Sequence, residues 1–305
     1  RRPYFPESGP LESARYEFRR PDLSDEKKIV IVSDTHSRVE CPVTMGRYWG
    51  DALDFLIMNG DIPAESKQPS DIMSVLEVAS GITEGKHPIV YVRGNHDTRG
   101  KYSLDFIDYI GNDAGNTYFT FRTGGIWGVV LDCGEDKNDG CTEYGDLVCC
   151  RPLRRRQTQF LKDVLENAQS EFAAPGVQRR IALCHIPFSI DRRQEPKFDI
   201  ERDVYAESTQ LLNRMDIDIM FCGHMHQNFA VTPDSPRNRF GANFPVVVSG
   251  KPFNKSEPGQ AAPKGPTTGA VVTLGPDWAR AVYRDSDGVD SGDERFAWRG
   301  HGASS

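Results

Sequence analysis

The sequence predicts an α/β fold in which buried strands end in polar loops. Five short apolar runs, rich in Val and Ile, each stop at a Gly, Asn, Asp or His, a pattern typical of buried strands followed by loops. Other segments carry apolar residues at helical spacing. The chain has 305 residues, of which 38% are hydrophobic and 27% charged, as in ordinary globular proteins. One large domain with a substantial core is therefore expected.

The five predicted strands run directly into short polar motifs. They cover residues 29–33, 53–58, 89–92, 180–184 and 217–222. The motifs that follow them are, in order, Asp34-Thr-His36, Gly60-Asp61, Gly94-Asn-His-Asp97, His185 and Gly223-His-Met-His226. Because layered α/β proteins place ligands at the carboxyl ends of strands, we expect these motifs to meet at one rim.

The remaining elements are predicted from periodicity. Apolar residues at helical spacing indicate helices over 71–80, 102–110 and 154–172, the last with a basic start that we expect to face solvent. Runs at 244–249, 270–274 and 278–283 are interpreted as strands of a second sheet. Between them, residues 251–268 are rich in Pro, Gly and Lys and are expected to form a surface loop.

The motifs gather seven candidate metal ligands of three chemical kinds. Carboxylate, imidazole and amide groups together suit a pair of adjacent divalent cations that share one ligand. The candidates are Asp34, His36, Asp61, Asn95, His185, His224 and His226. Five of the seven histidines fall in motifs, whereas His87 and His301 are expected to be ordinary surface or core residues. The Asp and Asn residues could also serve as turn formers.

The ordered motifs D-x-H, GD, GNH[DE], a single His and GHxH resemble the calcineurin-like metallophosphoesterases over residues 29–283. The resemblance implies a four-layer αββα sandwich, in which two mixed β-sheets are flanked by helices. It also implies an enzyme that hydrolyses phosphomonoesters or phosphodiesters by in-line attack of a metal-bound hydroxide. The cofactors would be two divalent metal ions, such as Mn, Fe or Zn.

The same resemblance implies a role for each motif residue. Asp34, His36 and His226 would bind one metal ion, Asn95, His185 and His224 the other, and Asp61 would bridge them. His96 would meet the scissile phosphate, where an imidazole can donate a proton to the leaving oxygen or stabilise charge. Asp97 would orient His96. One departure is Ala64, which occupies the position of the second Asp of the GDxxD pattern and puts the local loop geometry in question.

The resemblance also implies a domain organisation. Residues 25–284 would form the metallophosphoesterase catalytic domain, and the Ser, Gly and Asp content of 285–305 predicts a loosely held tail. Residues 13–19 alternate like a strand. Residues 1–24 would therefore be a terminal arm lying on the domain or the remnant of an upstream module. The compartment stays open, and secretion with the signal segment absent from this chain is one alternative.

The composition of the chain argues against two kinds of binding partner, nucleic acids and the membrane interior. The formal net charge of −7 argues against general nucleic-acid affinity, and no apolar run approaches the length that spans a bilayer. We expect a small phosphate-ester substrate, and the oligomeric state is not indicated. Two alternatives are a DNA or RNA nuclease on the same centre and a catalytically inactive, metal-stabilised scaffold. The presence of His96 favours catalysis.

The segment 134–156 is the longest candidate for a functional loop. It carries charged, aromatic and Cys residues without clear periodicity, which is typical of a lid that sets substrate choice. Asp136, Glu143 and Tyr144 are the candidates for that role. Cys133 and Cys141 could close a short disulfide, zinc binding by the cluster from Cys133 through Cys149 and Cys150 is an alternative, and Cys184 and Cys222 are predicted to be buried in strands.

Overall fold

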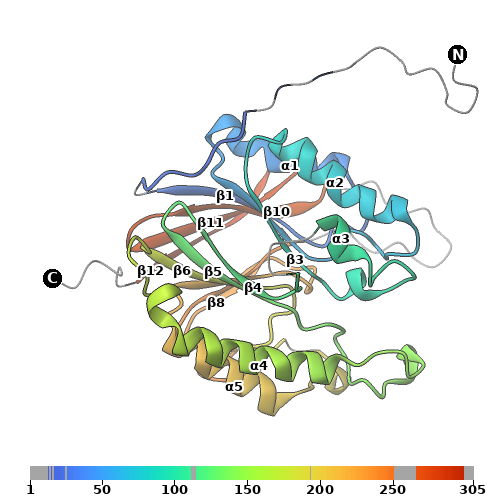
Figure 1. Ribbon diagram of the computed structural model, residues 1–305. Coiled ribbons are helices and arrows are strands. Elements are labelled where there is room, and N and C mark those ends of the chain that lie inside the picture. The colour runs from blue at the N-terminus through green and yellow to red at the C-terminus, as the bar shows by residue number, and fades with distance from the viewer. Residues whose placement is uncertain are drawn as a thin grey trace, which may run out of the picture.

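Two six-stranded β-sheets face each other, with helices on the outer side of each (Figure 1). The computed structural model describes residues 13, 15, 17–24, 26–110, 115–192, 194–250 and 266–298. Helices α1, α2 and α3 cover one sheet, and α4 and α5 cover the other (Figure 1). The predicted α/β sandwich of two mixed sheets flanked by helices is confirmed. No helix in the described ranges combines the length and apolar character needed to cross a bilayer.

The first sheet joins the beginning of the chain to its end. Its strand order is β12-β11-β10-β1-β2-β3, in which β1, β2 and β3 are parallel and the others antiparallel. The strands are β1 (Lys27–Val32), β2 (Phe55–Asn59), β3 (Ile89–Val92), β10 (Thr268–Leu274), β11 (Trp278–Asp285) and β12 (Asp290–Ala297).

The second sheet is built from the middle of the chain. Its order is β4-β5-β6-β7-β9-β8, with a parallel centre and an antiparallel strand at each edge. The strands are β4 (Phe119–Thr123), β5 (Ile126–Leu131), β6 (Arg179–Cys184), β7 (Ile219–Cys222), β8 (Phe229–Val231) and β9 (Val246–Val248). The central strands are buried throughout, as expected for parallel strands covered on both faces.

The helices bury one face each. They are α1 (Glu40–Gly46), α2 (Pro69–Thr83), α3 (Phe106–Ile110), α4 (Cys150–Glu166) and α5 (Arg202–Arg214). A capping box between Gln68 and Asp71 starts α2, with Pro69 in its first turn, and Glu84 in the left-handed conformation ends it. Short 3₁₀ turns cover Arg47–Ala52, His96–Thr98, Thr142–Tyr144, Ala168–Ser170 and Pro196–Phe198.

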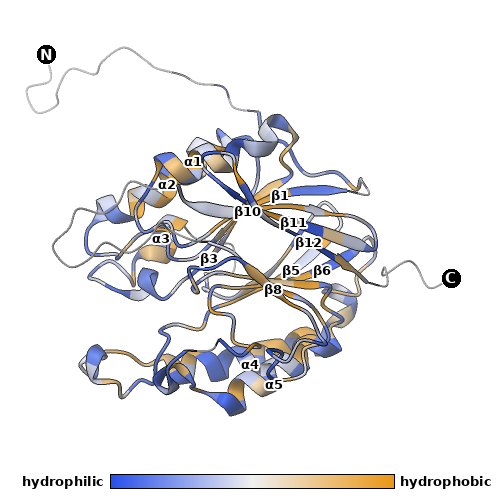
Figure 2. Ribbon diagram, turned by 180° about the vertical axis from the view of Figure 1, so that it is seen from behind, coloured by the Kyte–Doolittle hydropathy of each residue, from blue (hydrophilic) through white to orange (hydrophobic). Residues whose placement is uncertain are grey.

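Three apolar layers hold the sandwich together. The central layer lies between the sheets, and each of the others lies between a sheet and its helices. Figure 2 shows apolar residues concentrated in the strands and polar residues on the outer faces of the helices. The carboxyl ends of the parallel strands are therefore the places where polar side chains can gather without disrupting this core.

The prediction that the runs 244–249, 270–274 and 278–283 belong together in a second sheet is wrong. Strand β9 joins β7 in the second sheet, whereas β10 pairs with β1 and β11 with β10 in the first sheet. Five strands with polar motifs are thus divided between two sheets. The expected surface loop at 251–268 lies mostly outside the described residues, and its last residue, Thr268, begins β10.

The prediction of a loosely held tail from Asp285 is wrong, because strand β12 lies within it. This strand pairs with β11 from Trp278 opposite Ala297 onward. Arg280 forms two hydrogen bonds of 2.9 Å with Asp293, and Phe296 is buried against the central layer. The polar composition reflects an edge strand with one face in solvent, not a lack of structure. Residues 299–305 lie outside the described part.

The described part of the N-terminal arm lies on the domain. Residues 17–24 contain no strand, in contrast to the predicted alternation. The backbone N–H of Arg19 donates to Lys86 O at 2.7 Å, and its guanidinium donates to Asp51 O at 2.9 Å. These bonds anchor the arm close to the start of β3.

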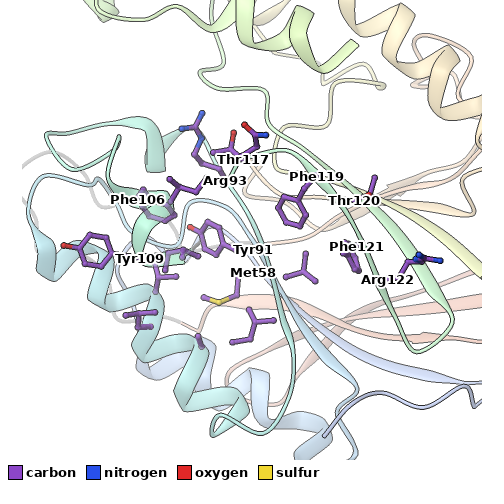
Figure 3. A pocket seen from close by; sticks show the side chains of 18 residues that line it. Met58, Tyr91, Arg93, Phe106, Tyr109, Thr117, Phe119, Thr120, Phe121 and Arg122 are labelled. Atoms are coloured by element: carbon purple, nitrogen blue, oxygen red, sulfur yellow. The ribbon is translucent and has the colours of Figure 1, made fainter. Parts of the chain in front are cut away.

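An apolar pocket of about 650 Å³ lies between α2, α3, β3 and β4. Figure 3 shows Tyr91, Phe106 and Phe119 among the side chains that line it. The rings of Tyr91 and Phe106 are 5.3 Å apart, and the Tyr91 hydroxyl donates to Asp97 Oδ2 at 3.0 Å. The wall of this pocket therefore connects to the GNHD motif.

Candidate metal centre

The motif residues lie at the carboxyl ends of parallel strands from both sheets. In the first sheet they follow β1, β2 and β3, and in the second they follow β6 and β7. Facing sheets bring these ends to one shared rim. The residues that meet there are Asp34 and His36 after β1, Asp61 after β2, Asn95 and His96 after β3, His185 after β6, and His224 and His226 after β7.

Asp34, His36 and His226 form one group of possible metal ligands. Their ligand atoms lie within 4.8 Å of one another. His226 Nε2 is 3.3 Å from Asp34 Oδ1 and 3.1 Å from His36 Nε2. Two imidazole nitrogens and a carboxylate oxygen thus converge on one point, as the coordination of a transition-metal ion requires.

Asp61, His185 and His224 form a second such group. Their ligand atoms also lie within 4.8 Å, with His185 Nε2 3.1 Å from Asp61 Oδ2. The side-chain oxygen of Asn95 is 3.0 Å from His224 Nδ1. His185 Nε2 also lies 3.8 Å from Asp34 Oδ1, so the two groups adjoin. The structure therefore brings all seven predicted ligands together.

Unsatisfied buried atoms support the fit of this site to cations. Among the described residues, Asp34 Oδ1, His185 Nε2 and His224 Nε2 are buried without a hydrogen-bond partner. Leaving such an atom unpaired costs about 1–3 kcal/mol. His185 Nδ1 donates to Asn59 O at 2.6 Å, which directs Nε2 toward the carboxylates, where a cation can take the place of the Nε2 proton. Donor set and geometry thus fit divalent metals.

Burial and charge set the protonation of the site. Burial lowers the pKa of His36 to about 4, and burial with the neighbouring His185 lowers the pKa of His224 to about 3. Both rings are therefore neutral near pH 7 and keep a lone pair for a cation. Burial alone would lower the pKa of His185, but the carboxylates of Asp61 and Asp34 raise it to about 10. These carboxylates attract positive charge to the point where the two groups meet.

The backbone of the site is strained at five candidate ligands. Positive φ angles of 46° to 69° occur at Asp34, His36, Asp61, His224 and His226. For residues with a Cβ this left-handed conformation costs roughly 1–2 kcal/mol each. The sharp turns it produces point side chains back over the strand ends and toward one another.

The motif glycines permit close approach. A Cβ on Gly94 would lie 2.2 Å from Asp61 Oδ1 and 2.4 Å from Asp61 N. A Cβ on Gly60, whose φ is +80°, would lie 2.5 Å from His185 Nδ1. Only glycine fits where these loops cross.

The sequence matches the calcineurin-like phosphoesterase family over residues 27–228. The chain belongs to this family. The resemblance stated from the motifs is therefore confirmed.

Among curated proteins, the chain is similar to serine/threonine-protein phosphatase CPPED1. It is 25% identical to the Pongo abelii protein and 27% identical to the Mus musculus protein, each over 184 residues. The match covers 57% of this chain and 54% of each relative. The chain thus spans about half the length of the curated relatives it matches.

Among solved structures, the purple acid phosphatase PPD1 from yellow lupin seeds has a similar fold. The TM-score is 0.55 at 14% sequence identity, over 91% of this chain and 55% of that one. At this identity the likeness supports the family's fold alone.

His96 of this phosphoesterase-family chain is oriented by a backbone carbonyl, not by Asp97. Its Nδ1–H donates to Ala64 O at 2.8 Å, and its backbone N–H donates to Asp61 Oδ1 at 2.8 Å. Because a carbonyl only accepts, the proton sits on Nδ1 and the other nitrogen, Nε2, is 4.0 Å from Asp61 Oδ2. Ala64 occupies the position of the second Asp of the GDxxD pattern, and it is its backbone carbonyl that orients His96.

The expectation that Asp97 orients His96 is wrong. Asp97 Oδ2 accepts hydrogen bonds from Gly94 N at 2.6 Å, the Tyr91 hydroxyl at 3.0 Å and Asp61 N at 3.3 Å. The tight turn after Gly94 points this carboxyl back into the loop crossing, away from the ring. Burial, followed by the nearby Asp61 carboxylate, raises the pKa of Asp97 to about 7. Through its hydrogen bonds to Asp61 N and Gly94 N, Asp97 holds the GD and GNHD loops together.

Arg99 and Glu135 lie beside His96 and were missed by the sequence reasoning. Arg99 donates from Nε to Glu135 Oε1 at 2.6 Å and from Nη2 to Glu135 Oε2 at 2.8 Å. Its Nη1 donates to His96 Nε2 at 3.0 Å. A two-bond guanidinium–carboxylate pair fixes direction as well as charge. No spacing rule links Arg99 to Glu135, so only the fold could find the pair.

The predicted lid reaches the rim, but it is shorter than expected. The loop covers residues 134–149, since α4 begins at Cys150. Asp136 Oδ2 lies 3.8 Å from His224 Nε2, and the Tyr144 hydroxyl donates to Asp136 Oδ1 at 2.9 Å. Lys137 pairs with Glu143 at 3.1 Å. All three candidate lid residues therefore take part in one hydrogen-bonded loop.

Arg154 does not face solvent as expected from the basic start of the 154–172 helix. It is buried, and its guanidinium donates to the carbonyls of Cys133, at 2.8 Å, and of Glu135. The arginine thereby fixes the start of the lid to α4.

The disulfide between Cys133 and Cys141 that the sequence left open is not formed. All seven cysteines are free thiols. Cys133 is buried with its sulfur 3.3 Å from that of Cys184, whereas Cys141 lies in the turn before Thr142–Tyr144. The metal-ligating groups found among the described residues contain no cysteine, so the zinc alternative has no support. Cys184 and Cys222 are buried in β6 and β7, as predicted.

Proposed function

We propose that this chain is a dinuclear metal-dependent hydrolase of phosphoric esters. The carrying observation is that two groups of ligand atoms adjoin at Asp34 and Asp61, with His96 next to them. Family membership supports the reaction class. The sharing of a carboxylate between two such groups is what a pair of divalent cations needs.

The proposed ligand sets follow the two groups. Asp34, His36 and His226 hold one cation, Asn95, His185 and His224 hold the other, and Asp61 bridges them. The unpaired Asp34 Oδ1, His185 Nε2 and His224 Nε2 atoms support this assignment, because each then gains a partner. Mn, Zn and Fe suit these mixed oxygen and nitrogen donors.

The residues around the cations position the ester. When bound, two divalent cations supply positive charge for the phosphate and lower the pKa of a water so that it can attack near neutral pH. His96 presents Nε2 to the rim, because Nδ1 is held by Ala64 O. Arg99, held by Glu135, carries a permanent positive charge beside that nitrogen. We propose that Arg99 contacts the phosphoryl oxygens, and that His96 donates to the leaving oxygen once Nε2 has taken up a proton and the guanidinium has turned from it to the phosphate.

Phosphomonoesters are the preferred substrates in this proposal. A monoester carries more negative charge than a diester, so a site with two cations and Arg99 favours it. The curated relatives are named serine/threonine-protein phosphatases, which supports phosphorylated protein side chains as the natural class.

The test compares two esters of one chromogenic alcohol. The protein is stripped of metal, reloaded with manganese, zinc or iron, and assayed with p-nitrophenyl phosphate and bis(p-nitrophenyl) phosphate. We expect metal-dependent turnover with a preference for the monoester. Folded protein without turnover for any metal would contradict the proposal and favour the scaffold alternative.

A further inference from the structure

A wide groove opens beside His96. Its volume is about 1190 Å³, which exceeds the ~300–1,000 Å³ typical of small-molecule pockets. One lip is the segment 98–104 and the other is the loop 134–149. His96 and Arg99 lie at the metal end, and Leu104, Leu147, Val148 and Leu153 add apolar surface. The groove therefore has room for a larger group than the phosphate.

Each lip exposes one leucine. Leu104 is 86% exposed and Leu147 is 90% exposed, the highest values among the exposed large hydrophobic residues of the described ranges. Single exposed leucines are common on protein surfaces. Two that line the same groove next to a candidate active site instead indicate a binding surface.

Backbone hydrogen bonds order both lips of the groove. On the first lip, Ser66 N donates to Arg99 O at 2.7 Å and Tyr102 N donates to Ser66 O at 2.8 Å. On the second, Leu147 N donates to Tyr144 O at 3.0 Å, and Tyr144 is itself bonded to Asp136. The exposure of these side chains is thus set by ordered lips.

The charges of the groove do not suit a polyanion. Three of the four cations that line it have carboxylate partners at short range: Arg93 with Asp132 at 2.6 Å, Arg99 with Glu135 at 2.6 Å and Lys137 with Glu143 at 3.1 Å. Glu65 adds a further acid to the lining. Arg156 is the fourth cation, and one exposed arginine beside these acids offers a nucleic acid or a second phosphate cluster little positive charge. The groove is therefore better suited to binding a ligand through apolar contacts.

We propose that this groove binds the polypeptide around a phosphorylated side chain, with apolar residues of that polypeptide seated against Leu104 and Leu147. The inference rests on the proposed function, because the phosphate must lie at the metal centre. It narrows the proposed substrate class, phosphorylated protein side chains, to those with apolar residues on either side in the polypeptide. An extended segment advances ~3.3 Å per residue, so several residues can contact the groove at once.

The test uses two synthetic phosphoserine peptides and two small esters. One peptide carries Leu two residues before and after the phosphoserine, and the other carries Ala there. The small esters are p-nitrophenyl phosphate and the more apolar 1-naphthyl phosphate. The variants are Leu104→Ser and Leu147→Ser, which are exposed and should fold. The matched control is Leu23→Ser, 64% exposed and outside the groove lining.

We expect the wild type to prefer the Leu peptide over the Ala peptide by about tenfold in kcat/KM. In each groove variant the ratio of kcat/KM for the Leu peptide to that for p-nitrophenyl phosphate should fall about tenfold. The Leu23→Ser control should keep the wild-type ratio. Circular dichroism and metal content verify that the variants are folded and loaded.

Three outcomes would overturn the inference. The first is that the wild type hydrolyses p-nitrophenyl phosphate and the variants keep the wild-type ratio of kcat/KM for the Leu peptide to that for p-nitrophenyl phosphate. The groove then does not bind the peptide, and the proposed function stands. If the variants lose rate equally toward 1-naphthyl phosphate and the peptide, the groove holds a small apolar alcohol. If the wild type hydrolyses no ester with any metal, the proposed function fails, and the inference with it.

Discussion

His96 shows how one hydrogen bond determines what a side chain can do. The carbonyl of Ala64 holds Nδ1–H, so the second nitrogen faces the rim and Arg99. His224 differs, since its Nε2 is buried without a partner and its Nδ1 lies 3.0 Å from Asn95 Oδ1. The two histidines therefore differ in their surroundings, and replacing them should have different effects on metal binding and on rate.

His224→Ala should abolish metal loading and activity together, whereas His96→Ala should keep the metal and lose rate. A positioned imidazole contributes roughly 10²- to 10⁴-fold to a rate, so we expect a fall of that size in kcat for His96→Ala. Metal content by plasma mass spectrometry and turnover of p-nitrophenyl phosphate give the two readouts. An unchanged rate in His96→Ala would show that the imidazole has no part in the chemistry.

Arg99→Lys should lower kcat/KM by roughly 10- to 100-fold, a loss typical of one removed donor to developing charge. Lysine keeps the charge but cannot reproduce the two parallel bonds to Glu135 or the contact with His96. Steady-state kinetics on the monoester and the diester provide the measurement, and the monoester should lose more. Equal losses for both esters would argue that Arg99 only supports the loop.

The sequence could reveal the residues of the site because the motifs have fixed spacing next to strand ends. All seven ligand candidates and His96 meet at the rim. Arg99 and Glu135 could not be paired, since they are far apart in the chain and neither lies in a spaced pattern with the other. The direction of Asp97 was also hidden, because it depends on a turn and not on residue type.

At the scale of elements, the ends of strands carry most of the function. The loops after β2 and β3 cross so closely that Gly94 touches Asp61. Most strands with continuous apolar runs were predicted, although the buried β5 was missed, whereas β4 and β12 have no such run. Both lie at sheet edges and expose one face, so their composition resembles that of loops.

Gly94→Ala should weaken metal binding at least tenfold and destabilise the fold by about 1–3 kcal/mol, the usual cost of overpacking. The new Cβ meets both the side chain and the backbone of Asp61, so no rotamer change relieves the clash. Gly140→Ala is the control, because nothing lies within 4 Å of its added Cβ. Urea unfolding and metal titration measure both effects. Wild-type affinity in Gly94→Ala would contradict the close crossing.

His87, between α2 and β3, should make the fold sensitive to acid. It is 5% exposed, and burial, followed by the charge of Arg19, lowers its pKa below 6.5. The unfolded chain then binds the proton more readily, so the stability from this group is present above pH 6.5 and lost as the pH falls below it.

His87→Gln should reduce the loss of stability between pH 7.5 and 5.5 relative to the wild type. Urea midpoints at these two values, measured for both proteins, provide the comparison. The same loss in the variant would mean that His87 is as easily protonated in the folded state as in the unfolded chain.

At the scale of the molecule, the candidate metal centre joins the two sheets. Asp34 and Asp61 come from the first sheet, and His185 and His224 come from the second. The core between the sheets could be anticipated from the apolar runs. The division of strands between sheets could not, since pairing of β1 with β10 depends on contacts between opposite ends of the chain.

Metal loading should therefore raise thermal stability. At a free cation concentration 100 times Kd, binding to the folded state contributes about 2.7 kcal/mol. The shift is about 2–4 °C per kcal/mol for chains of 150–250 residues and smaller for longer ones, so Tm should rise by about 5 °C. Differential scanning fluorimetry with and without chelator tests this, and His224→Ala should abolish the response. An increase in Tm that persists in this variant would point to cations bound elsewhere.

The left-handed turns at Asp34, His36, Asp61, His224 and His226 have a cost that extends beyond coordination. Glycine would adopt each of these conformations without penalty, but it would bring no ligand atom. Directed evolution of this chain for heat resistance alone should thus accumulate glycines at the rim and erase catalysis. At these five positions, the φ angle that serves catalysis lowers the stability of the fold. Stabilising substitutions that preserve activity should therefore be sought elsewhere in the sandwich.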